Sequence, residues 1–195
     1  MQIKTVAKGL FTALLMSVAA DAAYASTVEM QTLGRTNPPI GHYEFCQQYP
    51  DQCQSNGSDP GPLTLTEARW KAILQVNYKV NSTVEPETDE QIYGVEEKWA
   101  YPKTVGDCED YVLLKRKLLI DQGFSPADLL ITVVLQPNGD GHAVLTVRTD
   151  RGDFILDNMR NKVLVWHRIY LPEAPVRQEF RPVGQDRGRP FAGRG

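Results

Sequence analysis

Three residues in the middle of the chain have the side chains needed for a nucleophilic thiol site: Cys108, His142 and Asp157. A thiol becomes a good nucleophile when a base or a positive neighbour holds it as the thiolate. An imidazole base in turn needs an acceptor at its other nitrogen to fix its tautomer and orientation. These residue types together predict a nucleophilic Cys108, with His142 as base and Asp157 as the group that orients it.

Cys108 lies at the expected first position of a helix. Asp107 is a favourable N-cap, whose side chain can accept backbone N–H bonds from the first turn, and Gly123 is expected to end the helix. At this position the helix dipole and the unpaired N–H groups favour a thiolate. The alternative is a small core cysteine on a helix with an apolar stripe formed by Val112, Leu114, Leu118 and Leu119.

After the expected helix the hydrophobic period changes from 3.6 to 2, which predicts strands at 128–136, 142–149, 154–158 and 163–166. Short turns between them favour an antiparallel meander. If the loop before the third strand has two or four residues, His142 and Asp157 lie on the same face of the sheet. An odd loop would present Asn158 instead. Helices first and then a sheet indicate an α+β fold with the nucleophile helix packed on the sheet, in a papain-like order.

The segment before Cys108 begins with a second expected helix. Thr64 and Glu67 have the spacing of a capping box, and the helical period continues through Trp70, Ile73, Leu74, Asn77 and Val80. Residues 82–104 are polar and are expected to be irregular. Trp99 and Tyr101 either line a cleft beside Cys108 or pack in the core.

Residues 1–25 have the pattern of a secretory signal, with Lys4 and Lys8 before a short apolar run and a small-x-small site at Ala23 to Ala25. The apolar run is shorter than the ~20 residues that a membrane span needs, and no other stretch approaches that length. We therefore expect an exported mature chain without a transmembrane segment, located in the periplasm or secreted.

The composition restricts the remaining chain to one domain without nucleic-acid partners. The formal charge is −3, and it becomes −4 without residues 1–25, which hold two lysines and one aspartate. An acidic chain of this kind has no basic stripe to bind nucleic acid. The expected organisation is an extended arm at 26–62, a catalytic domain at 63–182 and a disordered tail at 183–195.

Three cysteines remain after export to a compartment that permits disulfides. Cys46 and Cys53 lie close together in the Pro- and Gly-rich arm, and we expect a disulfide between them. Cys108 is then the free thiol. His42 lies near Cys46 but has no matching ligand set, so zinc is not expected.

Three carboxylates surround Cys108 in the sequence: Asp107, Glu109 and Asp110. Nearby negative charge raises the pKa of a thiol and opposes the thiolate. A hard cation held by Asp107 and Glu109 would cancel this charge, and calcium fits because it accepts about six to eight oxygen ligands in irregular geometry. Asp110 is the weaker ligand, and backbone carbonyls, water or Asp140 would complete the shell. The alternative is that these residues only stabilise the helix start.

Three segments together resemble the bacterial transglutaminase-like cysteine peptidases: Gly106-Asp-Cys-Glu-Asp110 before a helix, Gly141-His-Ala-Val144, and Ile155-Leu-Asp-Asn158. The resemblance implies a transglutaminase-like fold with Cys108, His142 and Asp157 as a catalytic triad. It also implies a calcium-dependent periplasmic endopeptidase that cleaves a surface adhesin-like protein and releases biofilm, and it raises Asp107 and Glu109 as calcium ligands. An inner-membrane regulatory receptor stays open as a second partner.

Two other functions stay open at this point. A thioester intermediate can react with an amine as well as with water, which would make the chain an acyltransferase or amidase. A non-catalytic periplasmic module could also bind a protein and use Cys108 only structurally. Product analysis with an added amine distinguishes the first alternative, and thiol reactivity distinguishes the second.

Overall fold

The computed structural model describes Met30 and residues 37–54, 61–166 and 178–180. The expected signal sequence and C-terminal tail lie outside these residues. Within them, no helix is both long enough and apolar enough to cross a bilayer. The described elements are α1 (Ile40–Gln48), α2 (Pro50–Cys53), α3 (Glu67–Thr83), β1 (Glu85–Pro86), α4 (Asp89–Tyr93), β2 (Val105–Gly106), α5 (Cys108–Ile120), a 3₁₀ turn (Pro126–Asp128), β3 (Leu129–Leu135), β4 (Gly141–Thr149), β5 (Gly152–Asp157), β6 (Arg160–Val165) and β7 (Gln178–Phe180).

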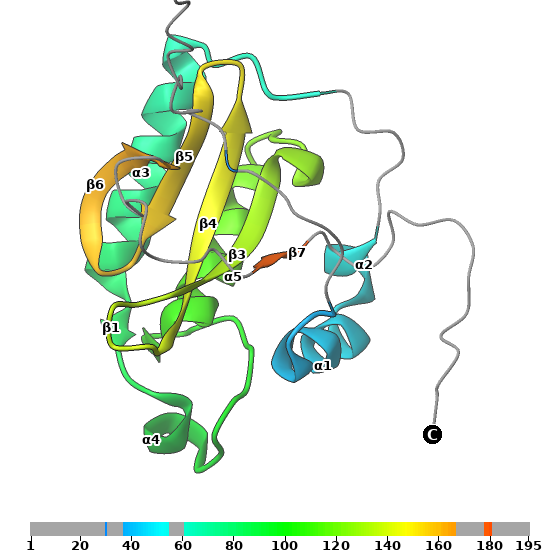
Figure 1. Ribbon diagram of the computed structural model, residues 1–195, viewed down its shortest axis with the longest axis vertical. Coiled ribbons are helices and arrows are strands. Elements are labelled where there is room, and N and C mark those ends of the chain that lie inside the picture. Colours follow the sequence, from blue (N-terminus) through cyan, green and yellow to red (C-terminus); the bar gives the residue numbers. More distant parts are fainter. Residues whose placement is uncertain (1–29, 31–36, 55–60, 167–177, 181–195) are drawn as a thin grey trace, which may run out of the picture.

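The main sheet has five strands in the order β6-β5-β4-β3-β7, and every neighbouring pair is antiparallel. The expected meander from β3 to β6 and the α+β class are therefore confirmed. Strand β7 was not expected, and it returns from the C-terminal part of the chain to pair with β3. Helices α3 and α5 lie on one face of the sheet, and α1 and α2 lie to one side of it (Figure 1).

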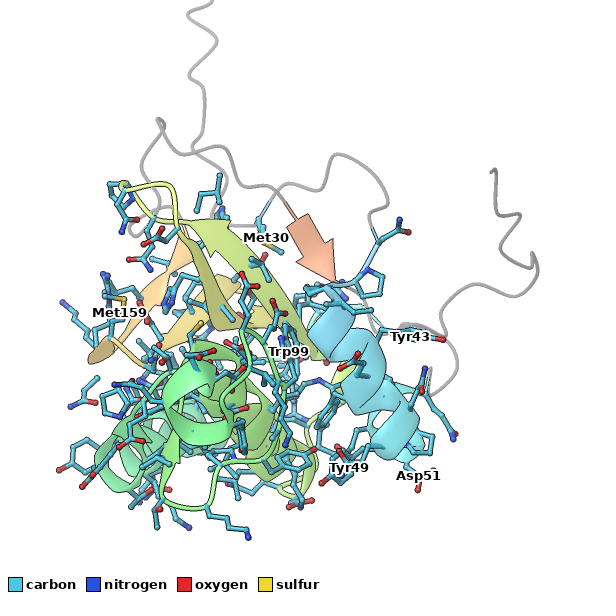
Figure 2. The ribbon with its side chains drawn as sticks, turned by 90° about the horizontal axis from the view of Figure 1, so that it is seen from below. Met30, Tyr43, Tyr49, Asp51, Trp99 and Met159 are labelled. Atoms are coloured by element: carbon cyan, nitrogen blue, oxygen red, sulfur yellow. A yellow bond between two sulfur atoms is a disulfide. The ribbon has the colours of Figure 1, made fainter. Side chains whose placement is uncertain are left out.

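The two faces of the sheet bury different amounts of apolar surface. The face toward α3 and α5 forms the larger core, which includes Ile73, Leu119 and Leu145. The opposite face carries a smaller cluster around Val144 and Ile155, and Met30 lies on that side (Figure 2). Helix α5 is thus held between α3 and the sheet, so its first residue has a fixed place at the end of β4.

Helix α3 begins two residues later than the sequence suggested. Its N-cap is Thr66, whose hydroxyl accepts a hydrogen bond from Arg69 N–H, so the capping box expected from Thr64 is wrong. Leu63 pairs with Thr149, and Leu65 N–H donates to Asp150 Oδ1 at 2.9 Å. These bonds hold residues 63–65 extended along β4, and the helix can start only after them.

The expected extended arm contains two helices, so that prediction is wrong for residues 40–53. Two prolines of this segment stand at helix starts, where their missing N–H costs no hydrogen bond. Pro39 is the N-cap of α1, and Pro50 occupies the first turn of α2. The expected disulfide joins Cys46 of α1 to Cys53 of α2. The disulfide thus links the two short helices to each other.

Trp99 and Tyr101 belong to the core rather than to an open cleft. Trp99 packs edge-on against His42 of α1, and it lies between α1 and the helices under the sheet (Figure 2). A Cβ atom at Gly41 would lie 2.3 Å from Trp99 Cδ1, so only glycine permits this close packing. Tyr101 packs edge-on against Phe45. Residues 82–104 are also more regular than expected, because they contain β1 and α4.

Candidate active site

Cys108 is the first residue of α5, and only Asp107 separates it from the short strand β2. The last residue of β2 must be a glycine, because a Cβ at Gly106 would lie 2.9 Å from Asp110 Oδ2. Asp107 is the N-cap residue, as expected, but its side chain makes no capping hydrogen bond. The carboxylate that should have capped the helix is therefore free to take part in another contact.

The Cys108 sulfur has two hydrogen-bond contacts. Ala143 N–H, next to His142 on β4, donates to Sγ at 3.3 Å, and the thiol donates to Glu109 Oε2 at 3.1 Å. Burial raises the pKa of the Cys108 thiol, and the charges of Glu109 and Asp107 raise it further, while the Ala143 N–H acts in the opposite direction. The thiolate-favouring effect expected from the helix start is therefore outweighed by burial and by the neighbouring carboxylates.

His142 and Asp157 are in direct contact. Their side chains are 6% and 1% exposed, and His142 Nε2 lies 2.9 Å from Asp157 Oδ1. The loop between β4 and β5 has two residues, since Thr149 pairs with Gly152, so both side chains share a face of the sheet. Asp157, and not Asn158, is the residue that the structure brings to His142.

The Asp157 carboxylate has two further partners. Met159 N–H donates to Oδ1 at 2.9 Å, and Arg160 Nε lies 3.0 Å from Oδ2. Burial alone would raise the pKa of Asp157, but the hydrogen bonds from His142 and Met159 N–H and the positive charge of Arg160 lower it. Asp157 is thus held as a carboxylate that can orient His142.

The three expected site residues are linked through β4: His142 contacts Asp157, and the N–H of the next residue, Ala143, contacts the Cys108 sulfur. No hydrogen bond joins Cys108 Sγ to His142 among the described residues; the sulfur instead contacts the backbone of the next residue, Ala143. Asp157 engages Nε2 of His142. Nδ1 is then the ring nitrogen that is left to exchange a proton with a thiol.

A group of three carboxylates lies beside Cys108. Asp89, Asp107 and Glu109 each offer an oxygen, and these oxygens lie within 4.8 Å of one another. One buried oxygen of Asp89 and one of Asp107 have no hydrogen-bond partner among the described residues. Burial raises the pKa of all three, and burial together with the Glu109 charge raises that of Asp107 to about 8. An all-oxygen donor set with unpartnered buried oxygens fits a hard divalent cation such as calcium.

Two other acidic residues considered from the sequence lie elsewhere. Asp110 Oδ1 accepts a hydrogen bond from Ala100 N–H at 2.8 Å, so it holds the loop before β2 instead of joining the group. Asp140 lies in the exposed turn between β3 and β4, with Asn138 Nδ2 at 2.6 Å from Oδ2. Neither belongs to the carboxylate group that the described residues form.

Sequence reasoning missed Asp89, which comes to the site from the first turn of α4. The parallel pairing of β1 with β2 places the segment after β1 next to the segment before Cys108. Asp89 Oδ2 also accepts a hydrogen bond from Lys98 N–H. The capping box from Thr88 to Gln91 was a usable sequence signal for α4. The pairing of β1 with β2 could not be predicted, because strands of two residues leave no recognisable pattern in the sequence.

Among the described residues, His42, Cys46 and Cys53 also lie close together, but the two sulfurs form a disulfide. His42 is buried beside the Cys46–Cys53 disulfide, with Cys46 Sγ 3.6 Å from its Nδ1. Burial lowers the pKa of His42 to about 4. Both sulfurs are used in the disulfide, so the thiolates that a zinc site needs are absent here. His167 lies outside the described residues.

Comparison with solved structures found the fold of LapG from Legionella pneumophila. The calcium-bound form has a TM-score of 0.50 and 21% sequence identity, and the match covers 83% of this chain and 88% of that chain. A second LapG structure has a TM-score of 0.42 and 22% identity, with 63% and 66% covered. The EGTA-treated form has a TM-score of 0.44 and 21% identity, with 65% and 66% covered. The chain thus covers slightly less than two thirds of these last two structures.

Comparison with curated proteins found no match. A family model described as bacterial transglutaminase-like cysteine proteinase matches residues 32–171, which include α1, α2 and all three residues of the expected triad. The match extends further toward the N-terminus than the three motifs alone suggested. The chain belongs to the family of bacterial transglutaminase-like cysteine proteinases.

Proposed function

We propose that this chain is an exported, calcium-dependent cysteine endopeptidase with Cys108 as nucleophile, His142 as general acid and base, and Asp157 as orienting residue. One observation carries the assignment: the His142–Asp157 pair lies one residue from the N–H that contacts the Cys108 sulfur. Family membership supports the peptidase chemistry. The roles of the three residues follow from their contacts and from the general logic of thiol catalysis.

In the proposed reaction, His142 Nδ1 takes the thiol proton and the thiolate attacks the carbonyl carbon of a peptide bond. The C–N bond then breaks, and His142 returns the proton to the departing amine, which leaves a thioester on Cys108. Water attacks the thioester with His142 again as base, and this releases the acid and restores the thiol. The first N–H groups of a helix lack intrahelical acceptors, and in the proposed reaction those at the start of α5 stabilise the oxyanion.

Asp89, Asp107 and Glu109 would hold the calcium ion. When bound, the ion supplies positive charge that offsets the carboxylates opposing a Cys108 thiolate. The chain's own contribution is to bring two segments together, α4 and the start of α5, at one point beside the sulfur. Release of the Glu109 carboxylate from the thiol would leave Ala143 N–H as the hydrogen-bond donor to the sulfur.

The compartment and substrate belong to the same proposal. The signal pattern at residues 1–25 and the Cys46–Cys53 disulfide support export to an oxidising compartment. We propose a surface adhesin-like protein as substrate, with an inner-membrane receptor as regulator. Cell fractionation tests the location, and intact mass of the exported chain tests whether it begins near Ser26.

The proposed activity is tested by incubating the protein with exported surface proteins from the same cells, with calcium and then with excess chelator. We expect wild type with calcium to generate new N-termini, while chelated wild type and Cys108→Ala generate none. An added primary amine that becomes attached to the products would assign acyl transfer instead of hydrolysis. Equal product patterns from wild type and Cys108→Ala would refute both activities.

A further inference from the structure

Asp157 lies where the sheet loses its regular pairing. The register between β5 and β6 changes from Ile155–Leu164 to Asp157–Arg160, which places an irregularity directly at Asp157. Bulges of this kind bend a strand and aim a side chain differently, but they also remove ladder hydrogen bonds that would fix it. The turn that carries Asp157 therefore needs another source of rigidity.

Two asparagines on α3 reach this turn. Asn81 Nδ2 lies 2.9 Å from the carbonyl oxygen of Asp157 and 3.1 Å from that of Arg160. Asn77, four residues earlier on the same helix face, has its Nδ2 at 3.0 Å from the carbonyl oxygen of Asn161. Both amides donate to backbone carbonyl oxygens of residues 157–161. In a regular antiparallel pair, backbone N–H groups of the neighbouring strand would be the donors to such oxygens.

The same turn supplies both sides of the Asp157 carboxylate. Its Met159 N–H contacts Oδ1 and its Arg160 side chain contacts Oδ2. Asn81 donates to the backbone of Asp157 and of Arg160. Fixing these two backbone positions therefore fixes the carboxylate and its cationic partner together.

The burial of Asn77 and of the Asn81 amide oxygen indicates that these side chains serve their hydrogen bonds to the turn. Asn77 is fully buried in the apolar face of α3, where a leucine would be the ordinary residue. The Oδ1 atoms of Asn77 and Asn81 are buried without a hydrogen-bond partner among the described residues. A buried amide whose oxygen has no hydrogen-bond partner lowers the stability of the fold. The hydrogen bonds from Nδ2 to the turn are therefore the reason to place an asparagine there.

We propose that Asn81, supported by Asn77, is a positioning residue that holds Asp157 against His142 from the α3 side. The catalytic consequence rests on the proposed function, whereas the effect on the His142–Asp157 hydrogen bond does not. Neither asparagine touches the reacting atoms. Their role is to replace, by side-chain donors, the ladder bonds that the β5–β6 irregularity removes.

The test compares Asn81→Leu, Asn77→Leu and the control Gln75→Leu, an exposed position on the same helix. In the full chain with saturating calcium, iodoacetamide alkylation of Cys108 reports the nucleophile. Nitrogen-15 NMR of labelled histidine reports hydrogen exchange of the His142 Nε2 proton. We expect Asn81→Leu to slow alkylation about tenfold and to speed exchange about tenfold. Asn77→Leu should give a smaller change of both, and Gln75→Leu none.

Melting curves separate positioning from folding. Since leucine removes an unpartnered buried oxygen as well as a donor, Asn81→Leu is expected to keep the wild-type melting temperature within a few degrees. Unchanged rates of alkylation and of exchange in Asn81→Leu would overturn the proposal. Rate changes that are fully explained by a larger fraction of unfolded protein would also overturn it. His142→Ala serves as the reference. If it leaves alkylation unchanged, the proposed function fails, and the exchange measurement on Asn81→Leu still decides the positioning role.

Discussion

The Cys108 thiol donates a hydrogen bond to Glu109 Oε2 at 3.1 Å, so the nucleophile of the proposed reaction is paired with the side chain of the residue that follows it. A carboxylate in this place favours the thiol over the thiolate. The same carboxylate belongs to the group with Asp89 and Asp107. In the proposed calcium site, thiol reactivity and cation binding would therefore be coupled through the side chain of Glu109.

This coupling predicts the reactivity of Cys108 in chelated protein. Because burial and the Glu109 charge raise the pKa of the thiol, Cys108 should alkylate more slowly at neutral pH than a free thiol, whose pKa is about 8.5. Glu109→Gln removes the charge and should speed alkylation several-fold in chelator. A chelated wild type that already reacts as fast as Glu109→Gln would contradict the coupling.

Calcium binding should depend on Asp89 as well as on Asp107 and Glu109. We expect calorimetric titration of chelator-stripped protein to give a binding signal that Asp89→Asn and Asp107→Asn weaken at least tenfold, since each removes a charged ligand. Calcium should also raise the melting temperature of the wild type. Asp140→Asn, in an exposed turn outside the carboxylate group, is the control and should bind like wild type. Equal affinity in all variants would place the ion elsewhere.

Lys115 should make the protein less stable at neutral pH than it would be with an apolar residue. Its side chain is fully buried, and its Nζ has no hydrogen-bond partner among the described residues. Burial lowers the pKa of Lys115 to about 7, against an opposing effect of Asp157. Between pH 7 and 10 the unfolded chain therefore holds a proton that the folded chain releases, and the contribution of Lys115 to stability rises with pH.

Accordingly, Lys115→Met should raise the free energy of unfolding by a few kcal/mol at pH 7, roughly the scale of a buried unpaired charge. The advantage over wild type should shrink as the pH is raised toward 9, which chemical denaturation at several pH values measures. Lys117→Met, on the exposed side of α5 where Lys117 pairs with Asp121, should change stability by about 0.5 kcal/mol or less. A constant difference between Lys115→Met and wild type across this pH range would argue against a titrating Lys115.

The Cys46–Cys53 disulfide should be the one bridge of the chain, with Cys108 free. Peptide mass mapping without reduction checks this pairing. The loop between Cys46 and Cys53 is short, so replacing both cysteines by alanine should lower stability by about 2–3 kcal/mol on the chain-entropy model. A bridge from Cys108 to either partner would remove the nucleophile and with it the proposed enzyme.

The parts of the fold that follow from local patterns were predictable. The period-2 segments and short turns gave the meander from β3 to β6, and the even loop gave the shared face of His142 and Asp157. Asp107 was correctly placed as the N-cap of α5, but its expected side-chain cap does not form. The N-cap position follows from the local sequence around Asp107. The group that Asp107 forms with Asp89 and Glu109 does not, because Asp89 comes from α4, which is distant in sequence.

The incorrect predictions share a physical cause. Thr64 has the sequence of a helix start, yet tertiary pairing of Leu63 with Thr149 delays the helix to Thr66. Pro39 and Pro50 stand where α1 and α2 begin, although the prolines and glycines of residues 26–62 suggested an extended arm. In both cases the local sequence pattern contains no information on the long-range contacts that decide where a helix starts.

The proposed catalytic triad is tested most directly by alkylation of Cys108 with iodoacetamide at neutral pH and saturating calcium, in wild type, His142→Ala and Asp157→Ala. Wild type is expected to react faster than a free thiol, and His142→Ala at least tenfold more slowly than wild type. Asp157→Ala should lie between them, because His142 remains but loses the partner at Nε2. Equal rates for wild type and His142→Ala would show that His142 does not activate Cys108, and the proposed catalytic triad would be wrong.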